Sequence, residues 1–156
     1  MAYSNRLSWV VALLLVAGFA ELAWAAEPPS DLCSLLPVAT VGKTLGYAYD
    51  SPKEKIAPRP FRNTNEGTDC VYGSGLRMLL LRVYVDPSPS ASADLFAKLK
   101  TYFAEGSTAV SGVGDEAYSD KEHGLHVRKG KVRYFLDGAG TPKQKNDLAV
   151  AIAGQL

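Results

Sequence analysis

The sequence is poor in residues that bind metals or carry redox chemistry, with two cysteines and two histidines among 156 residues. Cys33 and Cys70 are far apart, so the chain has no Cys-x-x-Cys motif and no cysteine pair with the spacing of a zinc site. Only His123 and His126 could add ligands to them. We therefore expect no metal site and no cofactor.

The sequence also lacks a large excess of either positive or negative charge. The formal net charge is +1, with 17 basic and 16 acidic residues. Proteins that bind nucleic acids usually carry a clear basic excess, because they must neutralise phosphates. No helix with a basic face for a membrane surface stands out either. The composition therefore argues against a nucleic-acid partner.

No apolar run is long enough to cross a membrane comfortably, which takes about 20 residues. The run from Trp9 to Ala20 has instead the length of the apolar centre of a signal peptide. Ala23 and Ala25 fit the two small positions of a cleavage site, so residues 1–25 are predicted to be a signal peptide. An uncleaved membrane anchor is the alternative, and Glu21 argues against it because it interrupts the apolar segment.

The expected mature chain, residues 26–156, is long enough for one domain with its own core. Small residues do not precede Cys33, so no lipoprotein attachment site is expected. These patterns predict a periplasmic or secreted protein without a stable membrane anchor after cleavage. In an oxidising compartment, Cys33 and Cys70 are expected to form a structural disulfide, with a redox or metal-binding pair as the alternative.

Apolar periodicity and turn signals predict an α+β fold: a single domain in which an antiparallel β-sheet is packed by two to three helices. Helices are expected from Pro37 to Leu45, from Ser90 or Ser92 to about Glu105, and from Thr141 to Leu156. Strands are expected from Cys70 to Tyr72, from Leu76 to Val85, from Leu125 to Arg128 and from Lys131 to Leu136.

The apolar residues of one expected strand and one expected helix also predict how these elements are buried. The strand from Leu76 to Val85 is apolar on both faces, so it is expected near the middle of the sheet with cover on both sides. The second helix has an apolar stripe that is expected to pack in the core rather than to bind a ligand: Leu95, Leu99, Tyr102 and Phe103. The segment from Tyr47 to Asp69 is expected to be a long loop, because it is rich in proline and poor in large apolar residues.

The stretch from Gly112 to Tyr118 reads Gly-Val-Gly-Asp-Glu-Ala-Tyr and matches the letters of a dinucleotide-binding loop. Such a loop needs a helix after it, and a hairpin follows here, so nucleotide binding is not expected. We favour a turn in which the glycines adopt positive φ and Asp115 bonds to nearby backbone N–H groups. Val113, Ala117 and Tyr118 would then dock on the core.

A hairpin is expected with Lys129 and Gly130 as its two turn residues. In that register Arg128 faces Lys131 and His126 faces Arg133. Five basic residues would then form one patch: His126, Arg128, Lys129, Lys131 and Arg133. The patch could bind an anionic ligand or an acidic partner surface, or it could be a charged edge that prevents strand-to-strand association.

Several short motifs together resemble a group of small exported bacterial domains of unknown function, many of which are lipoproteins. The motifs are Cys33-Ser-Leu-Leu-Pro37, Leu45-Gly46, Cys70-Val-Tyr72, Gly112-Val-Gly-Asp-Glu-Ala-Tyr118 and Val127-Arg-Lys-Gly130. Some such domains resemble the PsbP-like fold, which implies an antiparallel sheet flanked by helices. The resemblance also implies that the two cysteines pair, and it supplies no catalytic residues.

We therefore expect an exported, non-enzymatic domain that binds an envelope protein or an anionic ligand such as a glycan. The alternative is a small acid/base hydrolase that uses Asp115 or Glu116 with His123 or His126. The alternative is weaker because the sequence shows no nucleophile, oxyanion hole or metal cluster beside these residues.

Overall fold

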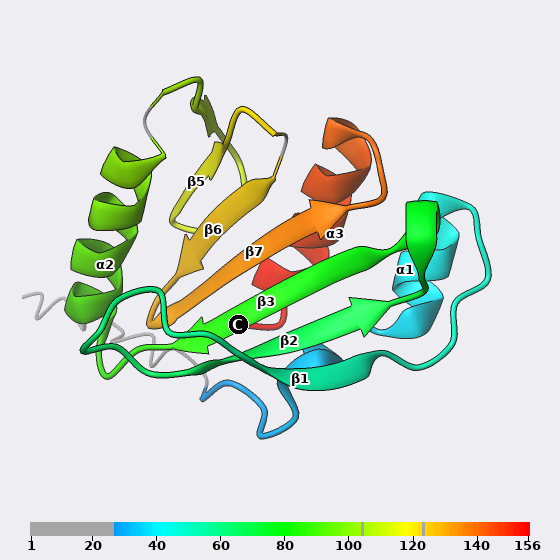
Figure 1. Cartoon of the computed structure of the whole chain (residues 1–156), viewed down its shortest axis with the longest axis horizontal. Coiled ribbons are helices and arrows are strands. Elements are labelled where there is room, and N and C mark those ends of the chain that lie inside the picture. The colour runs from blue at the N-terminus through cyan, green and yellow to red at the C-terminus, as the bar shows by residue number, and fades with distance from the viewer. Residues whose placement is uncertain (1–26, 104, 123) are drawn as a thin grey trace, which may run out of the picture.

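Seven antiparallel strands form one sheet in the order β1-β2-β3-β7-β6-β5-β4 (Figure 1). The computed structural model describes residues 27–103, 105–122 and 124–156, so the expected signal peptide, residues 1–25, lies outside the described residues. The strands are β1 (Lys53–Ala57), β2 (Gly67–Tyr72), β3 (Leu79–Val85), β4 (Thr108–Val110), β5 (Glu116–Ser119), β6 (Leu125–Lys129) and β7 (Val132–Gly138). The helices are α1 (Val38–Leu45), α2 (Pro89–Tyr102) and α3 (Pro142–Ala153), with short 3-10 turns η1 (Leu32–Leu35) and η2 (Gly75–Arg77). The expected α+β arrangement is confirmed.

The helices cover both faces of the sheet. On one face the Tyr134 hydroxyl donates to the Ala149 carbonyl oxygen of α3 at 2.7 Å, and α3 also contacts α1. On the other face Phe96 of α2 packs against Tyr118 of β5, with ring centroids 5.2 Å apart. In Figure 1, α3 passes behind the strands and α2 stands at the left of the sheet. Both helices contact β6 and β7, so these strands are covered on both sides.

Strand β3 lies near the middle of the sheet as expected, but the expected cover on both sides is only partly present, because Leu80 and Arg82 on one face are half-buried. Leu79, Leu81 and Val83 are fully buried and belong to the core beneath α1 and α3. The strand begins at Leu79, however, and not at Leu76 as expected, because the chain first turns through η2. Leu76 lies in that turn and is fully exposed.

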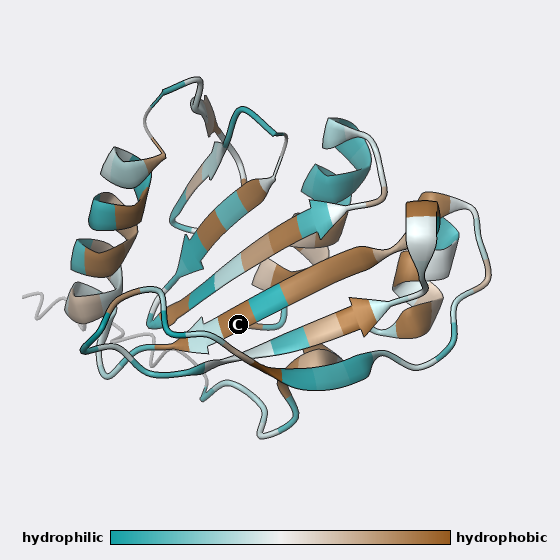
Figure 2. Ribbon diagram, viewed as in Figure 1, coloured by the Kyte–Doolittle hydropathy of each residue, from teal (hydrophilic) through white to brown (hydrophobic). Residues whose placement is uncertain are grey.

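The expectation of a long loop from Tyr47 to Asp69 is wrong in part, because this segment contains β1 and the start of β2. Strand β1 reads Lys-Glu-Lys-Ile-Ala, and four of its five side chains are exposed. It lies at the edge of the sheet, where its pairing with β2 supplies the backbone hydrogen bonds. Figure 2 shows it as a mostly hydrophilic strand. A charged edge strand lacks the apolar alternation on which strand prediction depends.

The ends of the helices follow local side-chain chemistry. Thr141 and Gln144 form the expected capping box at the start of α3. Helix α2 begins earlier than expected, because Pro89 takes a first-turn position and the Ser88 hydroxyl accepts a hydrogen bond from the Ala91 N–H at 3.1 Å. The helix ends at Tyr102 rather than near Glu105.

The expected disulfide between Cys33 and Cys70 is confirmed and joins η1 to β2. A buried hydrogen bond joins the same two parts of the chain, because the Tyr72 hydroxyl donates to the Leu36 carbonyl oxygen at 2.6 Å. The disulfide is consistent with an oxidising, exported environment. Among the described residues, no helix has both the length and the apolar character needed to cross a membrane.

Candidate functional site

Residues 112–115 form the turn that we favoured, and strand β5 begins directly after it at Glu116. Gly112 and Gly114 have φ of 79° and 59°. A Cβ on Gly114 would lie 2.5 Å from the Arg128 carbonyl oxygen, so a larger residue would be both strained and obstructed there. Val113, Ala117 and Tyr118 are buried as expected.

Asp115 joins this turn to the tip of the β6–β7 hairpin. Its backbone N–H donates to the Arg128 carbonyl oxygen at 2.8 Å, and its carboxylate accepts from the Gly130 N–H at 2.7 Å. The side chains of Arg128 and Lys129 each donate to the same carboxylate at 3.2 Å. Burial alone would raise the pKa of Asp115, but these donors outweigh it and hold the pKa below its ordinary value. The turn therefore holds the hairpin tip in place.

The hairpin register differs from the expected one. Arg128 pairs with Arg133, and His126 pairs with Phe135. The two turn residues are consequently Gly130 and Lys131, and Gly130 supplies the positive φ, at 56°, that the first turn position requires. The shift equals two residues, so the core face of the hairpin keeps the apolar residues that were expected there.

Each cation of the expected basic patch has a carboxylate partner. The pairs are Arg128 and Lys129 with Asp115, Lys131 with Glu27, and Arg133 with Asp86, at nitrogen–oxygen distances between 2.6 and 3.2 Å. The Arg133 side chain is only 4% exposed, and His126 is buried as well. The five residues therefore do not form one continuous, uncompensated basic surface.

A groove of about 510 Å³ lies on the sheet face that carries α2. Three cross-strand neighbours, His126, Phe135 and Arg82, form its floor. One wall is formed by the end of α2 and the residue after it: Leu99, Tyr102 and Phe103. The opposite wall is the segment after β1: Pro58, Arg59, Pro60 and Phe61. Tyr84 from β3 and two acidic residues, Asp120 and Glu122, complete the lining.

The two walls are attached to the floor by specific contacts. The Tyr84 hydroxyl donates to the Pro58 carbonyl oxygen at 2.7 Å, which ties the segment after β1 to β3. The Phe103 ring lies 5.3 Å from the His126 ring. Figure 1 shows the segment after β1 bending toward the side of the sheet on which α2 stands. The volume and the aromatic lining lie within the range that small-molecule sites have.

Among the predicted site residues that the structure describes, His126 is the one that lines this groove. Its ring lies between the rings of Tyr118 and Phe135, with centroids at 4.5 and 4.4 Å. Its Nε2 atom lies 3.0 Å from Oδ2 of Asp120. The Asp120 carboxylate also accepts the backbone N–H groups of Glu122 and Gly124, both at 2.9 Å. Asp120 is therefore a fixed partner of the imidazole.

The acid/base pairs expected with His126 do not form. Asp115 bonds to the hairpin tip, and Glu116 lies 3.0 Å from Lys100 of α2. His123 lies outside the described residues, so a pair with it stays a prediction. The carboxylate that does meet His126 is Asp120, which lies just after β5 in the connection to β6.

Burial controls the protonation of this pair. It lowers the pKa of His126 below the ordinary value of 6.5, although Asp120 and Asp137 act in the opposite direction. Burial would raise the pKa of Asp120, but the contact with His126 and the two backbone donors hold it below its ordinary value. The groove therefore holds an ionised carboxylate beside an uncharged imidazole near neutral pH.

We expect acidification to destabilise the fold through His126. Because the folded pKa lies below 6.5, the unfolded chain takes up the proton first, and the free energy of unfolding falls as the pH drops below about 6.5. Urea unfolding between about pH 7.5 and pH 5 should show this loss in the wild type and a smaller one in His126→Gln. His123→Gln is the matched control, since it removes the other histidine. Equal pH slopes in His126→Gln and the wild type would contradict the assignment.

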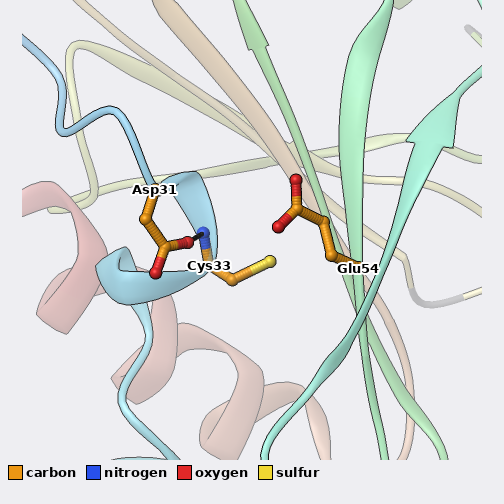
Figure 3. Close-up of side chains that lie close together, drawn as sticks. All are labelled: Asp31, Cys33 and Glu54. Carbon is orange, nitrogen blue, oxygen red and sulfur yellow. Dashed lines mark hydrogen bonds between the residues drawn. The ribbon is translucent and has the colours of Figure 1, made fainter.

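One group of side chains near the disulfide has the proximity expected of metal ligands. The carboxylates of Asp31 and Glu54 and the sulfur of Cys33 lie within 4.8 Å of one another. Figure 3 shows the three side chains close together. The Cys33 sulfur is bonded to Cys70, however, so it offers no thiolate. Asp31 already accepts the Cys33 N–H at 2.9 Å as the cap of η1. Two carboxylates beside a disulfide do not supply the ligand set of a structural metal site.

The groove was missed at the sequence level, and two signals could have indicated it. Tyr102 and Phe103 were expected in the core, yet they are 79% and 37% exposed and form a wall of the groove. Adjacent residues point about 100° apart around a helix axis, and the buried residues of α2 are instead Ser92 and Phe96, so the two rings lie beside the covered face. The Pro-Arg-Pro-Phe sequence from Pro58 to Phe61 is the second signal, since prolines give a loop fixed shape.

Comparison with protein-family models gives no match for this chain, and comparison with curated proteins gives none.

Proposed function

We propose that this chain is an exported, non-enzymatic binding domain and that the groove between α2 and the Pro58–Phe61 segment holds its ligand. The observation that carries the proposal is the lining, in which rings from the segment after β1, from β3, from the end of α2 and from the β6–β7 hairpin converge on one hollow. They are Phe61, Tyr84, Tyr102, Phe103, His126 and Phe135. Small-molecule sites have this character: mostly apolar and aromatic walls with a few fixed polar groups.

The groove supports binding better than the basic hairpin does. An anionic ligand at the hairpin would have to compete with Asp115 and Asp86, which already occupy its arginines. The exposed Tyr102 ring, by contrast, has apolar surface that a ligand could cover. Export is supported by the disulfide and by the predicted signal peptide, and it places the ligand in the periplasm or outside the cell.

A second candidate function is acid/base catalysis, and the Asp120–His126 pair is the observation that favours it. A general base must reach the proton that it removes, and this pair lines the groove. The described lining contains no serine, threonine, cysteine or lysine that could act as a nucleophile. We therefore consider catalysis the weaker of the two candidate functions.

We expect the uncharged amphipathic probe phenylbutanol to bind in the groove. In an NMR titration, saturable shift changes should be confined to groove residues. Tyr102→Ala should weaken binding by about fivefold to tenfold, because it removes one stacking ring without disturbing the core. Tyr47→Ala is the matched control, since Tyr47 is also exposed, at 44%, but lies outside the groove. Equal losses of affinity in Tyr102→Ala and Tyr47→Ala, or shift changes that do not saturate, would contradict the proposal.

A further inference from the structure

Each of the two cations in the described groove lining has a carboxylate partner outside the groove. Arg82 makes a two-point contact with Asp69, at 2.6 and 2.8 Å. Arg59 lies 3.4 Å from Glu66. These pairs leave little uncompensated positive charge at the β3 side of the groove.

The opposite end of the groove is acidic. Asp120 faces a histidine that is uncharged near neutral pH, so its negative charge is not cancelled. Glu122 is exposed and makes no side-chain ion pair with any described residue. A second hollow of about 310 Å³ continues from this end, and among the described residues its charged lining holds three carboxylates and one cation: Glu105, Asp120, Glu122 and Lys121.

Aromatic rings lie beside these carboxylates. Tyr102 and Phe103 line both hollows, and their rings meet nearly at right angles, with centroids 5.1 Å apart. Ring faces attract cations, and carboxylates next to them strengthen the attraction. An ammonium group that is only weakly hydrated therefore fits this end of the groove better than an anion or an uncharged group does.

We propose that the ligand is a small amphipathic organic ammonium ion, with its apolar body over Phe135 and its cationic head between the Tyr102–Phe103 corner and the Asp120–Glu122 end. The proposal rests on the groove being the binding site, as argued above. Charge complementarity selects the cation, because the lining and its ion-pair partners together carry an acidic excess at this end. The volume of the groove selects a small molecule rather than a folded partner.

Three probes that share one body test the charge preference: phenylbutyltrimethylammonium, phenylbutanol and phenylbutyrate. Isothermal titration near neutral pH should show the ammonium ion binding at least about tenfold more tightly than the alcohol, and the carboxylate binding most weakly. Glu122→Gln should weaken the binding of the ammonium ion by about threefold to fivefold and leave the affinity for the alcohol unchanged. Glu54→Gln is the matched control, because Glu54 is an exposed glutamate of β1 outside both hollows.

The outcomes separate this inference from the proposed function. Equal affinity for the ammonium ion and the alcohol, or tighter binding of the carboxylate, would overturn the charge assignment while leaving the groove as a binding site. Equal effects of Glu122→Gln and Glu54→Gln on the ammonium ion would overturn the location of its head group. If none of the three probes binds, both the inference and the proposed function fail.

Discussion

Replacing Asp86 by alanine is expected to lower the free energy of unfolding by about 3–5 kcal/mol, which would be one of the largest effects of a single substitution in this chain. Asp86 receives two hydrogen bonds from the Arg133 guanidinium, at 2.6 and 2.9 Å. The two side chains are only 2% and 4% exposed. Alanine would leave the Arg133 charge buried without a counter-ion, and a buried charge loses its hydration without compensation. Urea unfolding followed by circular dichroism measures the loss.

Two further variants make the test specific. Replacing both partners, as Asp86→Leu with Arg133→Met, removes the buried charges together and should recover most of the stability that Asp86→Ala loses. Asp147→Ala breaks the exposed pair between Lys143 and Asp147 in α3 and should cost only about 0.3–0.5 kcal/mol. If Asp86→Ala costs no more than Asp147→Ala, the Arg133 pair is not buried in solution.

Arg133 also shows why the burial of part of the expected basic patch could not be predicted from the sequence. Alternation along the hairpin placed His126, Arg128 and Arg133 on the face opposite the core, and the structure agrees with that assignment. The sequence pattern treats this face as solvated, because charged residues usually are. Helix α2 covers part of the face, however, and Asp86 comes from the turn that follows β3. Whether Arg133 is buried depends on tertiary packing, which a local sequence pattern does not indicate.

Local sequence signals were sufficient for prediction where a single residue type determines the backbone conformation. The capping box at Thr141, the stop of α1 at Gly46 and the turn at Gly112 and Gly114 were all predictable from side-chain and glycine chemistry. The disulfide could be predicted from the expected compartment and the cysteine count. These features need no knowledge of the rest of the fold.

Features that depend on distant segments could not be predicted in this way. The hairpin register changed by two residues because Gly130 occupies the first turn position, and both registers keep the apolar face intact. The groove combines residues from the segment after β1, from β3, from the end of α2 and from the β5–β7 region. Nothing in the sequence states that these segments meet, because the order of strands in the sheet differs from their order in the chain.

Removing the disulfide is the second change for which we expect a large effect. Replacing Cys33 and Cys70 together by alanine should lower the free energy of unfolding by about 4 kcal/mol, because the bond closes a loop between cysteines 37 positions apart and restricts the unfolded chain. The wild type under reducing conditions should unfold at nearly the same urea concentration as the double variant. A loss below about 1 kcal/mol in both would contradict a disulfide that constrains the unfolded state.

The same variant distinguishes the stability of the core from the function of the groove. Cys33 and Cys70 belong to the core on the α1 and α3 side of the sheet, whereas His126 and Phe135 line the opposite face. Domains of this kind have only about 5–15 kcal/mol of stability, so a loss of about 4 kcal/mol still leaves a mainly folded protein if the wild type lies above the lower limit. The folded double variant should therefore bind phenylbutanol with the affinity of the wild type. A loss of binding from a variant that is still folded would mean that the disulfide supports the groove through β2, where Asp69 holds Arg82 beside Cys70.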